Sequence, residues 1–164
     1  YARYTITRRV GSTEKITDKI LSERLSKVTE TVGSYPDSFN EALALEAVNW
    51  SAEESWIDYR YRVEKAHLNL YGAVHGGVIA SLADDAGGAA ACVFSGAYVS
   101  TATLAVEYLT AMNRPSYIIH VEVPHAGRRI VNTMIKIKEE QTGRICATAV
   151  ASFAVMSDKV MPEY

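Results

Sequence analysis

The chain has 164 residues, which is enough for one domain with a sizeable hydrophobic core. Hydrophobic residues make up 48% and charged residues 22% of it, as in ordinary globular proteins, and the net charge of −2 argues against a dedicated nucleic-acid-binding protein. No apolar run is long enough to predict a membrane span. Cys92 and Cys146 lack the spacing of a metal site, so we expect buried free thiols.

Residues 1–54 are expected to form an N-terminal helical extension that packs on the rest of the domain or on a dimer mate. Within residues 13–32, apolar side chains recur at helical spacing and the other positions are polar, which predicts an amphipathic helix. Ser12 and Thr13 are candidates for its N-cap. A second helix is expected over residues 37–47.

The first thirteen residues contain Arg3, Arg8 and Arg9 and no acidic residue. This composition fits a solvated basic arm, and it also fits the end of a mitochondrial transit segment. We therefore expect a cytoplasmic protein, or a mitochondrial one if the basic N-terminus is the remnant of a transit peptide.

Residues 55–164 are expected to form one α+β domain. Residues 56–64 alternate polar and apolar side chains, as in a half-exposed strand. After a long helix, further strands are expected at 101–109, 116–123, 129–139 and 144–156. The pattern predicts a single long helix wrapped by an antiparallel meander sheet.

The long helix is predicted from Gly77 to about Gly96, with Asp84 and Asp85 as its only charged residues. It is largely enclosed, because every other position is apolar or small. Gly87 and Gly88 should each cost on the order of 1 kcal/mol relative to Ala. We therefore expect the sheet to approach the helix backbone closely at these glycines.

In the strand expected at 101–109, side chains should alternate between the two faces of the sheet. One face would carry Ala102, Leu104, Val106 and Tyr108. The other face would carry Thr101, Thr103 and Glu107.

The entrance of the long helix combines several groups that can bind an anion. Gly76 and Gly77 are expected to leave N–H groups unpaired at the positive end of the helix dipole. Such N–H groups can hold a developing oxyanion. Asn69 and His75, which precede them, can donate further hydrogen bonds.

Asp84 is the strongest catalytic candidate, because a carboxylate on an otherwise apolar helix is costly to bury unless it pairs or takes part in chemistry. It follows His75 by nine residues, which in a helix means about 900° of rotation and about 13 Å of rise. The two side chains therefore point to opposite sides. Two antiparallel copies of the helix, related by a two-fold axis, could bring them together.

A second interpretation of the acidic pair stays open at this point. Asp84 and Asp85 could both lie on a solvated edge, or one of them could pair with an arginine.

The run N-x5-H-G-G-x6-D resembles the motif of the hotdog-fold acyl-CoA thioesterases of the PaaI / THEM2-like (4-hydroxybenzoyl-CoA thioesterase-related) group. It is formed by Asn69, His75, Gly76, Gly77 and Asp84. The resemblance covers about residues 55–156. It implies a hotdog fold, hydrolysis of a thioester to a free acid and CoA, and a homodimer that pairs into a dimer of dimers.

By this resemblance, Asp84 would act as nucleophile on the thioester carbonyl or as general base on water, and both roles stay open. The Gly76 N–H and the Asn69 side chain would hold the thioester oxygen. His75 would orient that group or the substrate. Thr101 corresponds to a Ser or Thr of the family that orients the attacking water, although an ordinary strand threonine would look the same.

Gly77 and Asp85 are expected beside the substrate. Arg128 and Arg129 are candidates for binding the CoA phosphates, with solvated surface charges as the simpler interpretation. The sequence contains no Gly-rich phosphate loop, zinc-site spacing or Ser-His-Asp order, so no metal or other cofactor is expected.

Two other functions remain possible. A hotdog hydratase or dehydratase would need a different arrangement of Asp and His. A non-catalytic hotdog protein would bind acyl-CoA as a sensor or scaffold and use its N-terminal helices to engage a partner. The complete set of Asn69, His75, Gly76 and Asp84 favours the thioesterase.

Overall fold

The computed structural model of the chain describes residues 16–156. The basic segment at the N-terminus and the caps expected at Ser12 or Thr13 lie outside the described residues. The helix expected from residue 13 begins at Asp18, and its cap is Thr17, whose Oγ1 accepts a hydrogen bond from the Ile20 N–H.

The elements follow one another in the order expected for an α+β domain with one long helix. They are α1 (Asp18–Gly33), α2 (Phe39–Leu43), β1 (Glu46–Ser51), β2 (Trp56–Arg62), the 3-10 turn η1 (Lys65–His67), α3 (Gly76–Ser95), β3 (Val99–Tyr108), β4 (Ser116–Ala126), β5 (Ile130–Glu139) and β6 (Ile145–Val155). The long helix and the four strands after it are confirmed within a few residues.

The six strands form one antiparallel sheet in the order β1-β2-β4-β5-β6-β3. The predicted meander is therefore wrong in one respect. Strands β4, β5 and β6 do follow one another, but β3 crosses to the far edge and pairs only with β6. Alternation along a strand predicts which side chains face the core, and it carries no information about which strand lies beside it.

The second predicted helix is also wrong in extent. Helix α2 has five residues and ends at Ala44, which adopts a left-handed conformation with φ 47°. Residues 46–51 form β1 and pair with β2. The first two of these residues were expected to end the helix predicted over 37–47. The N-terminal segment thus adds a strand to the sheet as well as two helices.

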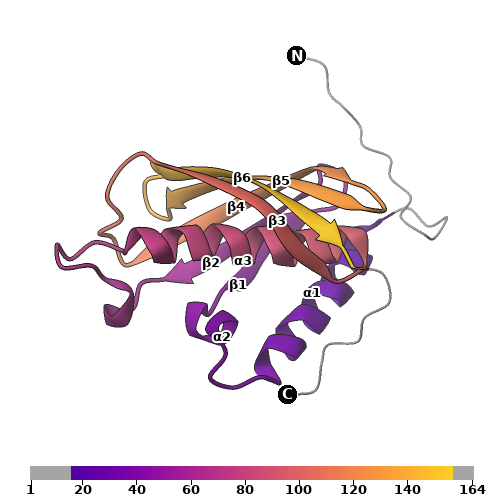
Figure 1. Ribbon diagram of the computed structural model, residues 1–164, viewed down its shortest axis with the longest axis horizontal. Helices are drawn as coiled ribbons and strands as arrows, with labels where there is room; N and C mark the ends of the chain where they lie inside the picture. Colours follow the sequence, from indigo (N-terminus) through magenta and orange to yellow (C-terminus); the bar gives the residue numbers. More distant parts are fainter. Residues whose placement is uncertain (1–15, 157–164) are drawn as a thin grey trace, which may run out of the picture.

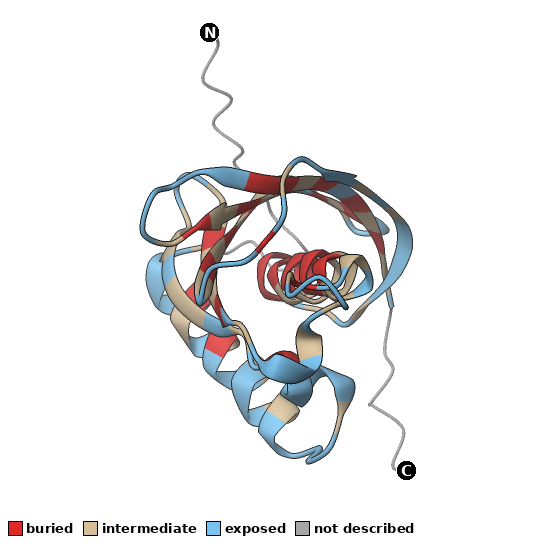
Figure 2. Cartoon of the chain, turned by 90° about the vertical axis from the view of Figure 1, so that its left-hand side faces the viewer, coloured by how far each residue is buried: buried red, intermediate tan, exposed pale blue. Residues whose placement is uncertain are grey.

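Helix α3 lies inside the curve of the sheet (Figures 1 and 2). It contacts β2 to β6, and α1 packs against it from outside the sheet. Ten of its residues are buried, including Ile79, Leu82 and Phe94. By length and composition alone, α3 is apolar enough to cross a membrane, contrary to the expectation from the sequence. Its burial in the core accounts for that composition.

The glycines of α3 mark a close approach of the sheet, as predicted. A Cβ at Gly87 would lie 3.1 Å from the ring of Phe153 and 3.2 Å from Thr133 Oγ1. A Cβ at Gly88 would lie 3.4 Å from the same ring. Since Phe153 and Thr133 are both buried on the sheet, a side chain at Gly87 would push α3 away from it.

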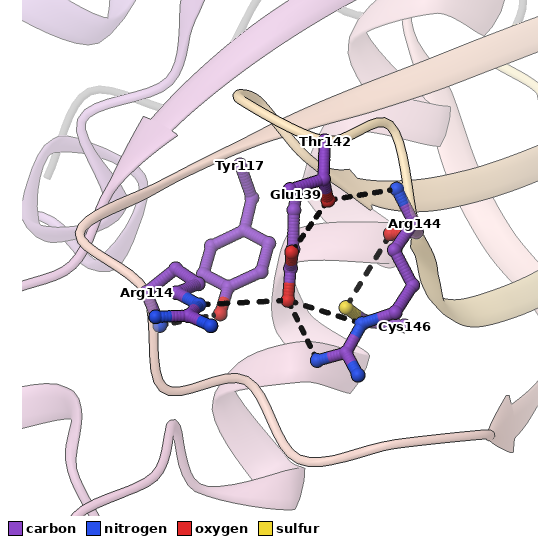
Figure 3. Close-up of polar contacts among 6 residues, drawn as sticks. All are labelled: Arg114, Tyr117, Glu139, Thr142, Arg144 and Cys146. Carbon is purple, nitrogen blue, oxygen red and sulfur yellow. Dashed lines mark hydrogen bonds and ion pairs between the residues drawn. The ribbon is translucent and has the colours of Figure 1, made fainter.

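A cluster around Glu139 holds the loop after β3 against the β5–β6 hairpin (Figure 3). The Glu139 side chain is 4% exposed. It accepts hydrogen bonds from Thr142 Oγ1 at 2.6 Å and from Arg144 Nη2 at 2.7 Å. Arg114 Nε lies 3.9 Å from it, and the Arg114 N–H donates to the Tyr117 hydroxyl.

The same loop anchors the segment that leads into α3. The carbonyl of Met112 accepts the Val74 N–H at 2.8 Å, directly before His75. The Leu109 N–H donates to the carbonyl of Cys146 on β6. The Glu139 cluster therefore helps to fix the position of the helix entrance.

We expect Glu139→Gln to lower the melting temperature at neutral pH. The hydrogen bonds from Thr142 and Arg144 hold the pKa of Glu139 below its usual value, so its carboxylate stabilises the folded state above that value. This stabilisation is lost as the pH falls through the folded-state pKa. Thermal unfolding of wild type and Glu139→Gln from pH 7 to pH 3 should show that the difference between their melting temperatures becomes smaller. Glu23→Gln, on the exposed face of α1, is the control, and an equal effect of both variants would contradict the assignment.

Candidate active site

The segment before α3 is held by the side chain of Asn69. Its Oδ1 accepts hydrogen bonds from the Tyr71 N–H at 2.9 Å and the Ala73 N–H at 3.2 Å. Gly72 completes this turn with φ 76°. Among the described residues the Nδ2 amide of Asn69 has no acceptor, so this group remains the donor that the side chain can offer.

His75 is the N-cap of α3. Its Nδ1 accepts the Gly77 N–H at 2.9 Å, so the neutral ring carries its proton on Nε2. The expectation that Gly77 leaves its N–H unpaired is therefore wrong, because the cap residue satisfies it. The Gly76 N–H has no acceptor within residues 16–156, so it remains a free backbone donor at this helix start.

Tyr108, at the end of β3, also belongs to the helix entrance. Its hydroxyl donates to the carbonyl of Gly76 at 3.1 Å, and its side chain is 55% exposed. Sequence reasoning placed it among the side chains of one strand face and missed this contact. The only signal in the sequence was an aromatic residue near the end of the strand predicted at 101–109.

Asp84 lies beside Thr101 of β3. The Thr101 hydroxyl donates to Asp84 Oδ1 at 2.8 Å. The predicted faces of this strand are wrong at this point, because the register shifts between Thr101 and Thr103. This bulge turns Thr101 to the side of the sheet that faces α3.

Asp85 has a different partner, since successive helix residues point about 100° apart. Asn40 Nδ2, from α2, donates to Asp85 Oδ1. The pKa of Asp85 is raised to about 6, mainly because the carboxyl group is buried. The hydrogen bond from Asn40 lowers this pKa, and the nearby charge of Asp84 raises it. Neither acid pairs with an arginine among the described residues, so this interpretation of the pair is not supported.

Asp84, Asp85 and Thr101 line a pocket of about 780 Å³ between α1, α3 and the start of β3. One wall is formed by α1, including Arg24, Lys27 and Val28. Across from it lie Cys92 of α3 and Phe153 of β6. The N-terminal extension thus builds one side of the cavity that holds the candidate catalytic residue.

The chain does not bring all predicted site residues together. Helix α3 is continuous, so Asp84 lies about 12 Å along its axis from Gly76. Asn69, His75, Gly76 and Gly77 are not in the pocket lining. Arg128 and Arg129 are exposed in the turn between β4 and β5 and do not line it either.

Asp85→Asn should stabilise the folded protein above about pH 6 and leave its stability unchanged below about pH 4. A folded-state pKa of about 6, against an ordinary value of 3.8, means that folding disfavours the ionised carboxylate. The difference between these values corresponds to at most about 3 kcal/mol. Thermal and urea unfolding at pH 8 and pH 4 test this, with Glu30→Gln on exposed α1 as control. A variant less stable than wild type at pH 8 would contradict the prediction.

Comparison with known proteins adds to this geometry. The sequence model of the Thioesterase superfamily matches residues 71–146, which include Asp84 and Thr101. A protein of Saccharolobus solfataricus that is named as an esterase is 25% identical over 135 residues, covering 82% of this chain and 94% of that protein.

Three solved structures share the fold. The Escherichia coli PaaI protein, from the phenylacetic acid degradation operon, has a TM-score of 0.70 at 20% identity and covers 84% of this chain and 96% of its own. Zebrafish thioesterase superfamily member 2 has a TM-score of 0.70 at 20% identity, and the match covers 79% of this chain and 94% of that one. A Streptococcus mutans protein bound to acetyl-CoA has a TM-score of 0.62 at 23% identity, and the match covers 68% of this chain and 88% of that one. The resemblance inferred from the sequence is confirmed: the chain has the hotdog fold, and its residues 71–146 match the model of the thioesterase superfamily.

Proposed function

We propose that this protein is an acyl-CoA thioesterase that hydrolyses a thioester to a free acid and CoA. The observation that carries the proposal is the half-buried Asp84 carboxylate, bonded to Thr101 on the wall of a 780 Å³ pocket. This pair lies within the segment that matches the thioesterase superfamily. Acetyl-CoA bound to the Streptococcus mutans neighbour supports a CoA thioester as the substrate.

The Thr101 hydroxyl occupies Oδ1 of Asp84 and leaves Oδ2 for the reaction. As a general base, Asp84 takes a proton from water while the water oxygen attacks the thioester carbon. As a nucleophile, Asp84 itself attacks that carbon, and water later hydrolyses the mixed anhydride. In both routes the carbonyl oxygen becomes an oxyanion, the C–S bond breaks, and the thiolate of CoA leaves.

We propose that the oxyanion is held by the Gly76 N–H and the Asn69 amide of a second subunit. Within one chain these donors lie about 12 Å or more from Asp84 along α3. Strand β3 supports a shared site, because it is a ten-residue sheet edge and most of its residues are exposed. Two β3 edges paired antiparallel would place two α3 helices antiparallel, with each helix start near the other Asp84.

Asp84→Asn should lower kcat for acyl-CoA hydrolysis by about 10²–10⁴-fold, because the amide can neither accept the proton nor attack. Acyl-CoA binding should stay within about twofold, because the amide keeps the shape of the carboxyl and can still accept from Thr101. Release of free thiol measures the rate, and calorimetry measures binding. Wild-type turnover would refute the role of Asp84, and undetectable turnover by the wild type across acyl-CoA substrates would favour a non-catalytic binding protein.

Gly76→Pro should lower kcat by about 10²–10³-fold, because it removes the proposed oxyanion donor. Proline is tolerated at the first position of a helix, and the preceding His75 has ψ 139°, which suits a residue before proline. Gly76→Ala keeps the N–H, and its Cβ would meet Tyr108 at an ordinary 3.6 Å, so this control should stay close to wild type.

Mixing these variants tests the location of the site. Unfolding and reassembling Gly76→Pro with Asp84→Asn should restore about a quarter of wild-type activity, because half of the dimers are mixed and each has one intact site. No recovery in a mixture shown to contain mixed dimers would mean that both residues act within one subunit.

A further inference from the structure

The pocket beside Asp84 is lined by acidic side chains of α3 and by basic side chains of α1. On α3 it is lined by a stripe that begins at Asp84 and Asp85 and ends at Gly96. Helix α1 lines the facing wall with Arg24 and Lys27. Arg24 lies at the end of α3, since its Nη1 donates to the carbonyl of Val93 at 2.7 Å.

The position of Arg24 depends on a residue without a side chain. A Cβ at Gly96 would lie 2.8 Å from Arg24 Nη2, and Gly96 also ends α3 with φ 70°. Gly96 therefore gives the guanidinium room to lie against the helix end, where the dipole favours a cation. A guanidinium has five N–H donors, and this contact with the Val93 carbonyl uses one of them.

No carboxylate lies within salt-bridge distance of Arg24 or Lys27 in the part of the chain that the structure describes. Arg24 is nevertheless half-buried. A half-buried cation without a charged partner is costly, and an anionic ligand group would offset this cost.

The acidic end of the pocket at Asp84 and the basic end at Arg24 lie far apart along α3. Val93 follows Asp84 by nine residues, which places Arg24 about 14 Å along the helix axis from the catalytic carboxylate. The walls between the two ends are mainly apolar. They include Val28 and Val32 of α1, Ala89 of α3 and Val99 of β3.

We propose that Arg24 and Lys27 bind an anionic group at the far end of the substrate, while the thioester lies at Asp84. This inference rests on the proposed function and deepens it, because it names a determinant of the substrate class. An anion at the opposite end of the pocket would be repelled by Asp84 and Asp85, so the charges also fix the orientation of the substrate.

Two parts of an acyl-CoA can carry such a group: a carboxylate at the end of the acyl chain, and the phosphates of CoA. The apolar walls favour the first, because an alkyl chain buries more favourably there than a pantetheine arm with two polar amides. A thioester of a dicarboxylic acid is therefore the substrate class that the pocket fits best.

The test compares hydrolysis of adipoyl-CoA and hexanoyl-CoA, which differ by the terminal carboxylate. In wild type, kcat/KM should favour adipoyl-CoA. Arg24→Met keeps much of the apolar stem and removes the charge. It should raise KM for adipoyl-CoA by about tenfold and change KM for hexanoyl-CoA by less than about twofold. Arg24→Lys should recover part of the loss, since it keeps the positive charge. Arg62→Met, exposed on β2 and paired with Glu46, is the matched charge control.

Thioesters of pantetheine, which carry no phosphate, separate the two sources of the anion. If Arg24→Met loses as much kcat/KM on adipoyl-pantetheine as on adipoyl-CoA, the terminal carboxylate is the anion that Arg24 binds. An equal loss on both CoA substrates that disappears on both pantetheine thioesters assigns the anion to the CoA phosphates and overturns the dicarboxylic substrate class. Unchanged rates on all four substrates in Arg24→Met overturn the proposal entirely.

A binding measurement distinguishes failure of this inference from failure of the proposed function. Calorimetric titration with adipate and hexanoate needs no turnover, and wild type should bind adipate more tightly than Arg24→Met does. Hydrolysis of hexanoyl-CoA by wild type reports on the thioesterase activity alone. Equal affinity of wild type and Arg24→Met for adipate would count against the anion site even in an active enzyme.

Discussion

The close packing of α3 against the sheet at Gly87 is the constraint on which the candidate site depends. Phe153 and Thr133 occupy the space that a side chain at Gly87 would take. If the helix stood further from the sheet, the 2.8 Å contact between Thr101 and Asp84 would be broken, since one partner lies on each layer. The lower helix propensity of glycine is thus offset by a geometry that lets a strand side chain reach a helix carboxylate.

That packing also separates the roles of two neighbouring carboxylates. Asp84 points to β3 and accepts a hydroxyl hydrogen bond, whereas Asp85 points to α2 and accepts an amide hydrogen bond. Burial dominates at Asp85 and raises its pKa to about 6. Adjacent helix positions therefore give one acid that faces the strand of the candidate site and one that ties the N-terminal extension to the core.

The sequence predicted the elements whose signal is local. Helical spacing gave α3 within one residue at each end, and the glycine pair correctly indicated close approach by the sheet. Features that depend on distant partners were missed, namely the strand β1, the place of β3 at the sheet edge and the bulge at Thr101. Each is decided by which strand lies alongside, and one strand's alternation does not contain that information.

The same distinction applies to the site. The Asn-His-Gly-Gly-Asp motif predicted candidate groups, but not that His75 would occupy the Gly77 N–H or that Tyr108 would reach Gly76. No sequence motif indicated Arg24, because its position in the pocket follows from how α1 packs against the end of α3.

The place of α1 has a consequence for how substrate preference is encoded. The matched superfamily segment, residues 71–146, contains Asp84 and Thr101, whereas the pocket wall formed by α1 lies outside it. Residues on that wall contact the cavity without taking part in the hydrogen bond that holds Asp84. For the proposed thioesterase, substitutions there would change which acyl group fits while the proposed chemistry at Asp84 stays the same. The segment that matches the superfamily thus carries the candidate catalytic pair, whereas the acyl group has to be inferred from the charges and shape of the α1 wall.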